Sequence, residues 1–348
     1  MNAELPQGPL WNMAIEDQEN WWKNHFSGPK FRLQQMRDWV YDKAVLNPQG
    51  MKNLPPALQN EIAKLSAAKL KKTDHLKSSD GSADKILFKN EGNDLLESVL
   101  LRSEKRRTVC MSTQVGCALG CTFCNTGLAG FKRNLDPAEM IEQVLHIANS
   151  ENERISNIVV MGMGEPMLNY DNLLIALRQI NHPKGMNLGT RHITISTSGI
   201  KGAILKLAQE PEQWGLAISL HAPDDELRSK LMPINKSFSI SELLAEVNEY
   251  INVTNRRVSF EYVMLKDTNS EKSHARALAK LLKGMLCHVN LIPYNPVPSL
   301  EHEASTNKSI QQFAQILNDA GVPCTIRKEK GQDILAACGQ LAHKKKQG

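Results

Sequence analysis

Three cysteines that could bind metal lie close together in the stretch TVCMSTQVGCALGCTFCNTG, residues 108–127. Cys117, Cys121 and Cys124 follow the spacing C-x3-C-x2-C, and no fourth cysteine or histidine follows at a matching interval. Thiolates so spaced can hold three irons of a four-iron cluster and leave the fourth iron open to a substrate or cofactor. The aromatic Phe123 just before the third cysteine, and the alternating strands and helices that follow, favour such a cluster.

Zinc is the alternative occupant of the same loop. Structural zinc sites are closed by four protein ligands, so a cysteine from later in the chain would have to complete the set through space. The candidates for this ligand are Cys287, Cys324 and Cys338. The two occupants are easily told apart, because a zinc protein is colourless and redox-silent whereas an iron–sulfur protein is brown and oxygen-sensitive.

Composition places these thiols in a reducing compartment. The 348 residues are 41% hydrophobic and begin without the basic and apolar regions of a secretory signal. No run of about 18 apolar residues occurs, so no membrane span is expected. We therefore expect a cytoplasmic protein whose cysteines serve as ligands or reactive groups. The net charge of +5 is compatible with a nucleic-acid partner without requiring one.

Strands and helices alternate after the cysteine loop. Short β-type runs predict strands at residues 157–164, 192–198, 216–222, 258–266, 288–295 and 324–328. Apolar residues at helical spacing predict helices at residues 137–149, 170–181, 201–209, 240–251, 273–285 and 307–320. The first helix has a strong start signal, since Asp136, Pro137 and Glu139 fit a capping box with proline in the first turn. This alternation predicts parallel strands joined by crossover helices.

The predicted fold class is α/β, a partial (β/α)6-type barrel with a small N-terminal helical domain and a short β-hairpin extension. Residues 1 to about 75 have helical spacing, the polar stretch 72–85 has the composition of a linker, and residues 86–113 contain two or three short strands. We divide the chain into a helical accessory domain, a strand extension, the barrel and a C-terminal tail, at residues 1–80, 81–112, 113–330 and 331–348.

Polar and glycine residues follow several of the predicted strands. The C-terminal ends of parallel strands meet at one edge of a barrel, and that edge carries the working residues. The segments that reach it are residues 164–166, 196–199, 219–221 and 293–295. A cofactor bound beside the cysteine loop would be contacted from these segments.

The cysteine loop and a glycine-rich segment resemble a known superfamily. CALGCTFC is similar to the cluster loop of the radical S-adenosylmethionine superfamily, and MGMGEP resembles the segment that contacts S-adenosylmethionine in those proteins. Further stretches resemble one family, the RlmN-type adenine-C2 methyltransferases of 23S rRNA and tRNA: ESVLLRSEKRRTVCMSTQVGCALGCTFCNTG, GFKRNL, MGMGEPMLN, STSG, SLHAPDDELR, LIPYNP and GQDILAACGQL. This likeness extends from roughly residue 30 to residue 342.

The resemblance implies a [4Fe–4S] cluster and two molecules of S-adenosylmethionine per turnover. Cys117, Cys121 and Cys124 would hold three irons, and the amino and carboxylate groups of S-adenosylmethionine would chelate the fourth. Electron transfer from the cluster would then cleave S-adenosylmethionine and yield a 5′-deoxyadenosyl radical, a reaction that the cofactor and not the protein supplies. The missing fourth ligand would thus be the place of the cofactor.

The resemblance also implies three catalytic residues. Cys338 matches the cysteine that is first methylated and whose methyl carbon then adds to C2 of the adenine. Cys110 matches the thiol that resolves the protein–RNA adduct through a transient disulfide, and both thiols are expected to be accessible with a low pKa. Glu97 matches the proton acceptor. Without the family, Cys338 and Cys110 would be small buried hydrophobes and Glu97 a solvated strand carboxylate.

The family likeness assigns a cofactor pocket to the edge of the barrel. The residues that it implies are Gly164, Glu165, Ser196, Ser219, Leu220, His221 and Asn295. Without the family, GMGEP is only a glycine-containing strand end, and His221 would be a hydrogen-bonded core histidine.

RNA partners follow from the same likeness, namely adenine 2503 of 23S rRNA and adenine 37 of tRNAs, together with an electron donor such as flavodoxin. We expect a monomer. The N-terminal helical domain and the basic clusters at residues 105–107 and 132–133 could hold RNA phosphates. Alternatives are methylation at C8 of the same rRNA adenine, a radical enzyme with a non-RNA substrate, and a zinc-bound RNA-binding module.

Overall fold

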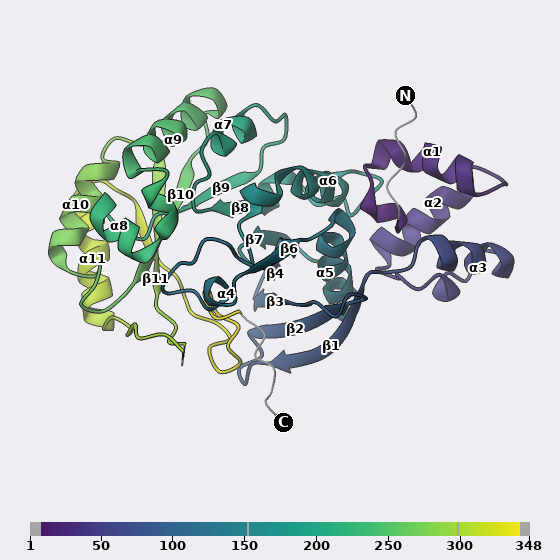
Figure 1. The fold of residues 1–348 in the computed structure, drawn as a ribbon, viewed down its shortest axis with the longest axis horizontal. Coiled ribbons are helices and arrows are strands. Elements are labelled where there is room, and N and C mark those ends of the chain that lie inside the picture. Colours follow the sequence, from purple (N-terminus) through teal and green to yellow (C-terminus); the bar gives the residue numbers. More distant parts are fainter. Residues whose placement is uncertain (1–7, 152, 298, 342–348) are drawn as a thin grey trace.

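One large sheet forms the centre of the molecule (Figure 1). The computed structural model describes residues 8–151, 153–297 and 299–341, so the ends of the predicted accessory domain and tail, 1–7 and 342–348, lie outside the described residues. The sheet has ten strands in the order β1-β2-β3-β4-β7-β8-β9-β10-β11-β12. Their bounds are β1 Leu70–Lys77, β2 Ala83–Asn90, β3 Leu95–Ser103, β4 Arg106–Cys110, β7 Asn157–Val160, β8 Ile193–Thr197, β9 Gly215–Ser219, β10 Val258–Met264, β11 Cys287–Pro293 and β12 Cys324–Ile326.

The sheet has a parallel part and an antiparallel part. Strand β4 and strands β7 to β12 are parallel neighbours, whereas β1 to β4 form an antiparallel meander. In the described part of the chain β1 does not pair with β12, so the barrel stays open. A separate two-stranded sheet is formed by β5 Gln114–Gly116 and β6 Phe131–Asn134.

Helices connect the parallel strands in sequence. They are α4 Asn125–Leu128, α5 Pro137–Ser150, α6 Tyr170–Asn181, α7 Ala203–Ala208, α8 Asp225–Leu231, α9 Ile240–Thr254, α10 Lys272–Leu282 and α11 Asn307–Asp319, with short 3-10 turns at Pro166–Asn169, Thr190–His192 and Pro233–Lys236. No helix of residues 8–151, 153–297 or 299–341 is long and apolar enough to cross a membrane. The predicted α/β class with a partial barrel is confirmed, and every strand and helix predicted between residues 137 and 328 is present.

The predicted start signal of α5 is also present. The carboxylate of Glu139 accepts a hydrogen bond from the backbone N–H of Asp136 at 3.0 Å, and Pro137 occupies the first turn. One turn further along, the amide of Gln143 bonds the backbone of Ser112, with distances of 2.8 and 3.0 Å. Helix α5 therefore fixes the chain just beyond the end of β4, where the thiol loop begins.

The prediction of a helix end followed by a linker was wrong for residues 70–85, which belong to the β1–β2 hairpin, whereas the strand predicted from residue 86 is present in β2. Most side chains of β1 are exposed, so its sequence LKKTDHLK lacks the apolar alternation of a half-buried strand. The hairpin turn consists of the polar and glycine residues that are also typical of a linker. Ser78 donates to Asp80 at 2.8 Å, and Gly81 has a φ of +67°. Polar composition thus concealed an exposed edge strand.

Residues 8–65 form the small helical region at one end of the molecule, beside α5 and α6 (Figure 1). Its elements are a 3-10 turn at Leu10–Asn12, α1 Ile15–His25, α2 Phe31–Arg37 continuing into a π-helical turn at Asp38–Asp42, a 3-10 turn at Pro48–Gly50, and α3 Pro56–Leu65. Its apolar residues belong to the same core cluster as those of the barrel.

Two buried polar side chains join this helical region to the barrel. Gln179 on α6 donates to the carbonyl of Trp11 at 3.0 Å and accepts from the hydroxyl of Tyr41 at 2.7 Å. Glu142 on α5 accepts from Trp11 Nε1 at 2.7 Å. The same carboxylate accepts the backbone N–H groups of Lys69 at 3.0 Å and Leu70 at 2.6 Å. Glu142 therefore holds the helical region and the start of β1 against the barrel.

Replacing Glu142 with glutamine should destabilise the protein by about 1–3 kcal/mol, because the amide nitrogen, unlike either oxygen of the acid or the carboxylate, cannot accept the N–H group that it would face. Burial raises the pKa of Glu142 to about 7, from an ordinary value of 4.5. The contribution of this raised pKa to the free energy of unfolding is fully present below about pH 4.5 and is lost as pH rises through about 7. Urea unfolding should therefore show a larger loss for E142Q at about pH 5 than at about pH 8.

The control for this comparison is Glu249→Gln, which alters an exposed carboxylate on α9. It should leave the free energy of unfolding unchanged at both pH values. Equal losses for E142Q at the two pH values would contradict the assignment of a raised pKa to Glu142.

Candidate functional site

The three predicted thiol ligands lie on one loop between β5 and α4. Cys121 is buried, whereas Cys117 and Cys124 are partly exposed. Burial raises the pKa of Cys117 to about 11 and raises that of Cys121 as well, and the negative charge of Cys124 adds to both shifts. The three thiols are thus close enough to interact electrostatically. The floor beneath them is apolar and consists of Leu119, Phe123, Ala222, Leu231, Met232, Val263, Leu265 and Tyr294.

Two glycines allow neighbouring segments to approach the loop. Gly116, at the end of β5, has a φ of +75°, and a Cβ there would lie 1.7 Å from the carbonyl oxygen of Gly130. This closeness lets the N–H of Cys117 donate to the same carbonyl at 3.0 Å. Gly164 has a φ of +101°, and its Cβ would lie 2.5 Å from Cβ of Gln114. A side chain at either glycine would push β5 away from the loop.

This donor set fits a [4Fe–4S] cluster. Three thiols above an apolar floor match the ligands and the dry surroundings that such a cluster needs. Among the residues that the structure describes, no three His, Cys, Asp or Glu side chains converge on a single metal ion. The thiolates of a cubane bind separate irons, so they need not converge.

The geometry does not support the zinc alternative. A closed zinc site needs four convergent ligands. Cys287 and Cys324 are the first residues of β11 and β12, so they lie at the edge of the parallel sheet opposite the thiol loop. Cys338 lies near the loop but lines the cavities beside it.

A cavity at the C-terminal edge of the strands adjoins Cys124. Six of the seven predicted cofactor-contacting residues line it, namely Gly164, Glu165, Ser196, Ser219, His221 and Asn295. The seventh, Leu220, differs because its side chain is fully buried in the apolar core. Leu220 offers only its backbone, whose N–H donates to the carbonyl of Glu261 at 3.1 Å.

Glu165 is buried at the wall of this cavity and joins two strand ends. Its carboxylate accepts from the hydroxyl of Thr197 at 2.6 Å and from the N–H groups of Ser198 at 2.9 Å and Met167 at 3.1 Å. Burial raises the pKa of Glu165 in spite of these bonds. The carboxylate therefore holds the segment after β7 against the end of β8 at the wall of the cavity.

His221 has the hydrogen-bonded, buried character of a core histidine and also lines the cavity. Its Nδ1 accepts from the backbone N–H of Val263 at 3.0 Å, which places the ring proton on Nε2. Burial lowers the pKa of His221 to about 3, so the ring is neutral at physiological pH. Its ring meets the edge of Phe123 with centroids 4.8 Å apart. The histidine therefore couples the thiol loop to the end of β9.

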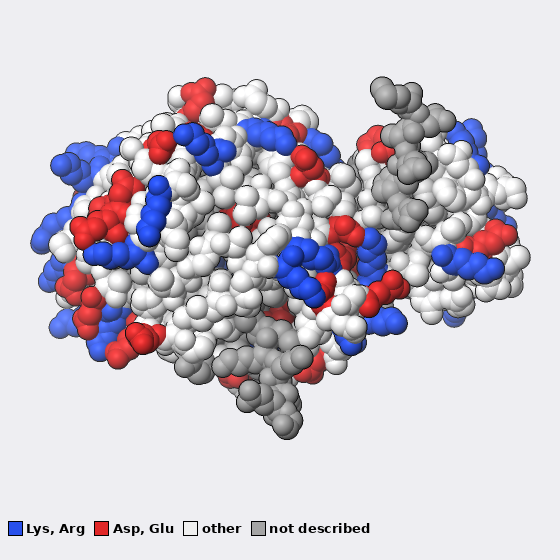
Figure 2. Space-filling model, viewed as in Figure 1, with Lys and Arg blue, Asp and Glu red and all other residues white. Residues whose placement is uncertain are grey.

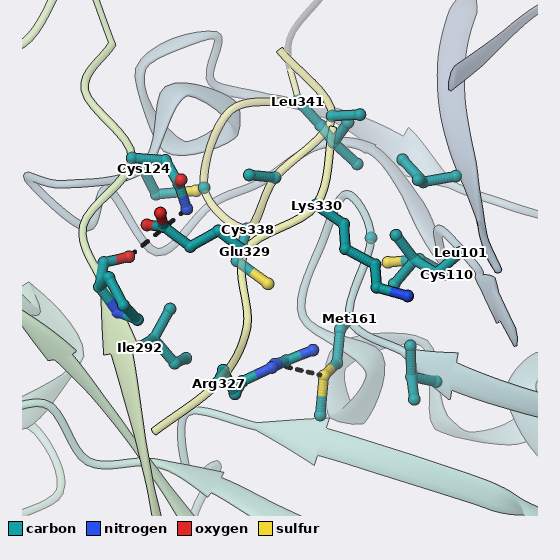
Figure 3. A pocket seen from close by; sticks show the side chains of 18 of the residues that line it. Leu101, Cys110, Cys124, Met161, Ile292, Arg327, Glu329, Lys330, Cys338 and Leu341 are labelled. Carbon is teal, nitrogen blue, oxygen red and sulfur yellow. Dashed lines mark hydrogen bonds between the residues drawn. The ribbon is translucent and has the colours of Figure 1, made fainter. Parts of the chain in front are cut away.

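Cys110 and Cys338 line a second cavity, which shares Cys124, Asn295 and Arg327 with the first. Figure 3 shows the sulfur atoms of both cysteines directed into this space, with the guanidinium of Arg327 reaching toward it from β12. Cys338 is exposed and Cys110 is buried. The spacing of the cysteines in the sequence did not predict that Cys110 and Cys338 line the same cavity, because they are far apart in the chain.

The environment of Cys110 differs from the expected accessible thiol of low pKa. Burial raises the pKa of Cys110 to about 12, the charge of Cys338 raises it further, and Arg327 acts in the opposite direction. Arg327 lies 3.6 Å from Glu261 and donates to the sulfur of Met161 at 3.8 Å. The sequence prediction missed Arg327; the only signal was its place at the end of a predicted strand.

Glu97 lies on β3, buried, and does not line either cavity. Glu97 is two residues from Val99 on the same strand, so the two side chains point to the same face of the sheet, and Val99 lines the second cavity and is paired with Cys110. Lys85 lies 3.4 Å from the carboxylate of Glu97. Glu97 is therefore beside the two-thiol cavity, and its role as proton acceptor stays a prediction.

The segment that carries Cys338 is held to the thiol loop by α4. The backbone N–H of Asn125 donates to the carbonyl of Gly339 at 2.8 Å, and its side chain donates to Gln340 at 3.2 Å. The hydroxyl of Thr126 donates to the carbonyl of Leu341 at 2.5 Å. The residues that directly follow the last thiol ligand thus position the tail.

The strand extension holds the other side of this tail. Asp333 accepts from the backbone N–H of Ser79, in the β1–β2 turn, at 2.8 Å. Lys85 on β2 donates to the carbonyl of Leu335 at 3.2 Å. Gln332 bonds Asn295 at 2.7 Å, which connects the tail to the first cavity. The antiparallel meander is therefore a support for the Cys338 segment.

The basic cluster at residues 105–107 does not face the site. Strand β4 begins at Arg106 and ends at Cys110, so the cluster lies at the opposite edge of the sheet. Arg107 is paired with Glu153 at 2.5 Å. This cluster is not placed at the two-thiol cavity, and its expected role in holding RNA phosphates stays a prediction.

The second basic cluster, Lys132 and Arg133, lies on β6 near the loop but is largely neutralised. Both side chains pair with Asp94, and Arg133 also pairs with Glu139 at 2.7 Å. Figure 2 shows Lys and Arg interspersed with Asp and Glu over this face. The described residues on this face form no extended field of one sign.

Comparison with known proteins gives the class of this fold and site. The sequence profile described as Radical SAM superfamily matches residues 111–278. A crystal structure of a radical SAM methyltransferase from Sphaerobacter thermophilus is similar with a TM-score of 0.93 and 41% identity, covering 96% of this chain and 99% of that one. The protein thus has the architecture of a radical SAM methyltransferase.

Curated relatives narrow the assignment to a family. A probable dual-specificity RNA methyltransferase RlmN from Bacillus cereus is 44% identical over 99% of this chain and 96% of the relative. A relative of the same name from Bacillus anthracis matches with the same identity and coverage. The chain belongs to the RlmN family.

Replacing Thr126 with valine should loosen the Cys338 segment without altering the thiol ligands. Loss of one buried hydroxyl–carbonyl bond costs about 1 kcal/mol, which is about a fivefold change in an opening equilibrium. Hydrogen exchange of a peptide spanning residues 331–341 should therefore accelerate by about fivefold. The matched control is Thr254→Val on α9, which removes a hydroxyl–carbonyl bond of 2.6 Å to Tyr250. If both variants exchange the tail at the wild-type rate, Thr126 does not position it.

Proposed function

We propose that this chain is a radical S-adenosylmethionine methyltransferase that methylates C2 of adenine 2503 in 23S rRNA and of adenine 37 in tRNAs. The observation that carries the proposal is the meeting of Cys110 and Cys338 in one cavity that adjoins the three-thiol loop. Relatives named dual-specificity RNA methyltransferases support RNA as the substrate.

The cofactors are bound by the loop and by the first cavity. Cys117, Cys121 and Cys124 hold a [4Fe–4S] cluster, and S-adenosylmethionine lies in the cavity that Glu165 and Asn295 line. When bound, the cluster and S-adenosylmethionine supply a one-electron cleavage that gives a 5′-deoxyadenosyl radical. The contribution of the chain is to orient the cofactor and to exclude water by means of the apolar floor.

Cys338 is the methyl carrier. Its thiolate attacks the methyl carbon of a first S-adenosylmethionine, so that an S–C bond forms as the sulfonium bond breaks and S-adenosylhomocysteine leaves. The exposed position of Cys338 and the neighbouring charge of Arg327 suit this step. The new methyl group on Cys338 would be the group from which the radical chemistry of a second S-adenosylmethionine removes a hydrogen atom, and its carbon would then add to C2 of the adenine.

Glu97 accepts the proton that C2 loses. Glu97 is buried next to Lys85, and on β3 it is two residues from Val99, which lines the two-thiol cavity. Its carboxylate therefore lies next to that cavity. Proton transfer needs a base within hydrogen-bond reach of the reacting carbon or reach through one water. RNA binding would bring the adenine and the carboxylate of Glu97 together.

Cys110 releases the product. As long as Cys338 is a free thiolate, its negative charge raises the pKa of Cys110, whereas a methylated Cys338 is a neutral thioether and removes that effect. Arg327 remains and favours the Cys110 thiolate. Before this step, the unpaired electron of the adduct would return to the cluster as C2 loses its proton. The Cys110 thiolate then attacks the sulfur of Cys338, and a disulfide forms as the bond from sulfur to the RNA-linked carbon breaks. That carbon keeps the electron pair and takes up a proton to become the methyl group. A cellular reductant then restores both thiols.

The remaining partners follow from this chemistry. The cluster needs a one-electron donor, for which a flavodoxin-type protein is suitable, and two molecules of S-adenosylmethionine are used for each methyl transferred. We further propose a monomer that works in the cytoplasm, where thiols are kept reduced.

The decisive experiment compares three cysteine variants in an anaerobic assay with 23S rRNA and tRNA. Cys338→Ala should lower RNA methylation by at least about 100-fold while retaining iron and sulfide. Cys110→Ala should accumulate a covalent protein–RNA adduct that survives denaturing electrophoresis. Cys324→Ala removes a thiol at the opposite sheet edge and should behave as the wild type. Mass spectrometry of digested RNA should identify 2-methyladenosine.

Three outcomes would contradict the proposal. An unaltered methylation rate in Cys338→Ala would remove the methyl carrier and favour another class of radical enzyme. A product methylated at C8 would replace the C2 assignment by the sister activity. Wild-type protein that contains zinc and no sulfide after anaerobic purification would reject the cluster itself.

A further inference from the structure

Arg228 is a fully buried cation beside the thiol loop. Its side chain on α8 is 0% exposed. Its guanidinium donates to the carbonyls of Ser198 at 2.6 Å, Ser219 at 3.1 Å and Leu220 at 3.1 Å. A fourth bond goes to Oδ1 of Asn235 at 2.8 Å. All four acceptors are neutral, so they satisfy the donors without cancelling the charge.

No carboxylate among the described residues hydrogen-bonds Arg228 directly. Asp225 contributes at longer range, because Asn235 lies between them and donates to Asp225 at 2.8 Å. Asp225 is exposed, so water screens its charge. A buried charge without a buried partner is costly and persists only where something compensates it. Burial lowers the pKa of Arg228 only to about 10, so it remains a cation.

The position of Arg228 points to the thiol loop as the compensating partner. Helix α8 packs directly on this loop, since the carbonyl of Leu231 accepts from the N–H of Thr122 at 3.0 Å. Leu231 and Met232 belong to the same apolar cluster as Cys121. Cys121 is also the negative group with the largest effect on Arg228.

We infer that Arg228 is an internal counter-charge of the iron–sulfur cluster, a positioning residue that raises the reduction potential of the cluster. The inference rests on the proposed function, because it presupposes a cluster on the three thiols. A [4Fe–4S] cluster with three thiolates carries net negative charge, and reduction adds one more. A nearby buried cation stabilises the more negative state, since its field is weakly screened in apolar surroundings. Potentials of such clusters are set by net charge and hydrogen bonding.

This counter-charge has a defined place in the reaction. One electron passes from a donor flavoprotein to the cluster, so the donor is oxidised and the cluster reduced, and neither a proton nor a group is transferred. Arg228 raises the fraction of enzyme that a given donor can reduce. The same guanidinium bonds the carbonyls of Ser198 and Ser219, whose residues line the cofactor cavity.

The first test compares Arg228→Lys with Arg228→Gln in the reconstituted holoenzyme. Lysine keeps the charge but not the four hydrogen bonds, whereas glutamine is neutral and keeps some of them. R228Q should lower the equilibrium constant for cluster reduction by about tenfold, which is about 59 mV for a one-electron couple. R228K should stay near the wild type. The readout is a redox titration of the reduced cluster followed by electron paramagnetic resonance.

A second variant leaves Arg228 in place, so it tests the effect of the Arg228 charge on the reduction potential even if R228Q fails to fold. The double exchange Asp225→Asn with Asn235→Asp moves a carboxylate from the surface to the atom that Arg228 bonds, and it retains the side-chain pair at 2.8 Å with donor and acceptor reversed. The potential should fall as in R228Q. Asp225→Asn alone is the matched control, and it should not lower the potential.

The outcomes separate this inference from the proposed function. An unchanged potential in the double exchange overturns the inference. Equal falls in R228K and R228Q, without a fall in the double exchange, also overturn it and leave Arg228 with a purely structural role. A wild-type protein without iron and sulfide instead rejects the proposed function, because then no cluster exists for Arg228 to influence.

Discussion

Hydrogen bonds between the first helical turn after the thiol loop and the C-terminal tail connect residues 215 positions apart in the chain. Asn125 and Thr126 directly follow Cys124, and the carbonyls that they bind flank the Cys338 segment. The rest of the site depends on this contact, because it holds Cys338, the proposed methyl carrier, at the cavities beside the thiol loop. Barrel, meander and tail each contribute one wall, and α4 is the element that touches both the loop and the tail.

Charge is scarce around this contact, and each buried charge has a recognisable partner or task. Glu165 accepts three hydrogen bonds and joins the ends of β7 and β8. Arg327 lies between Glu261 and the two thiols. In apolar surroundings such groups interact more strongly than they would in water. The site therefore consists of a few isolated charges whose effects on thiols and cluster are large.

Most of the fold could be predicted from the sequence because the parallel strands are short apolar runs between amphipathic helices. The thiol loop could be predicted for the same reason, since its ligands are close in sequence. Exposed strand β1 could not, as its polar residues resemble a linker. Arg228 and Arg327 were missed because the groups that surround a cation in the folded chain are a tertiary property that sequence spacing does not show.

The unequal burial of the two cavity thiols gives an order to the proposed reaction. Cys338 is exposed and can reach a methyl donor, whereas Cys110 is buried, and burial raises its pKa to about 12, so this thiol is protonated at neutral pH. A premature disulfide would need the Cys110 thiolate, and burial suppresses that species. An adenine bound between the two sulfur atoms would also separate them. The cavity thus favours methyl transfer first and disulfide formation last.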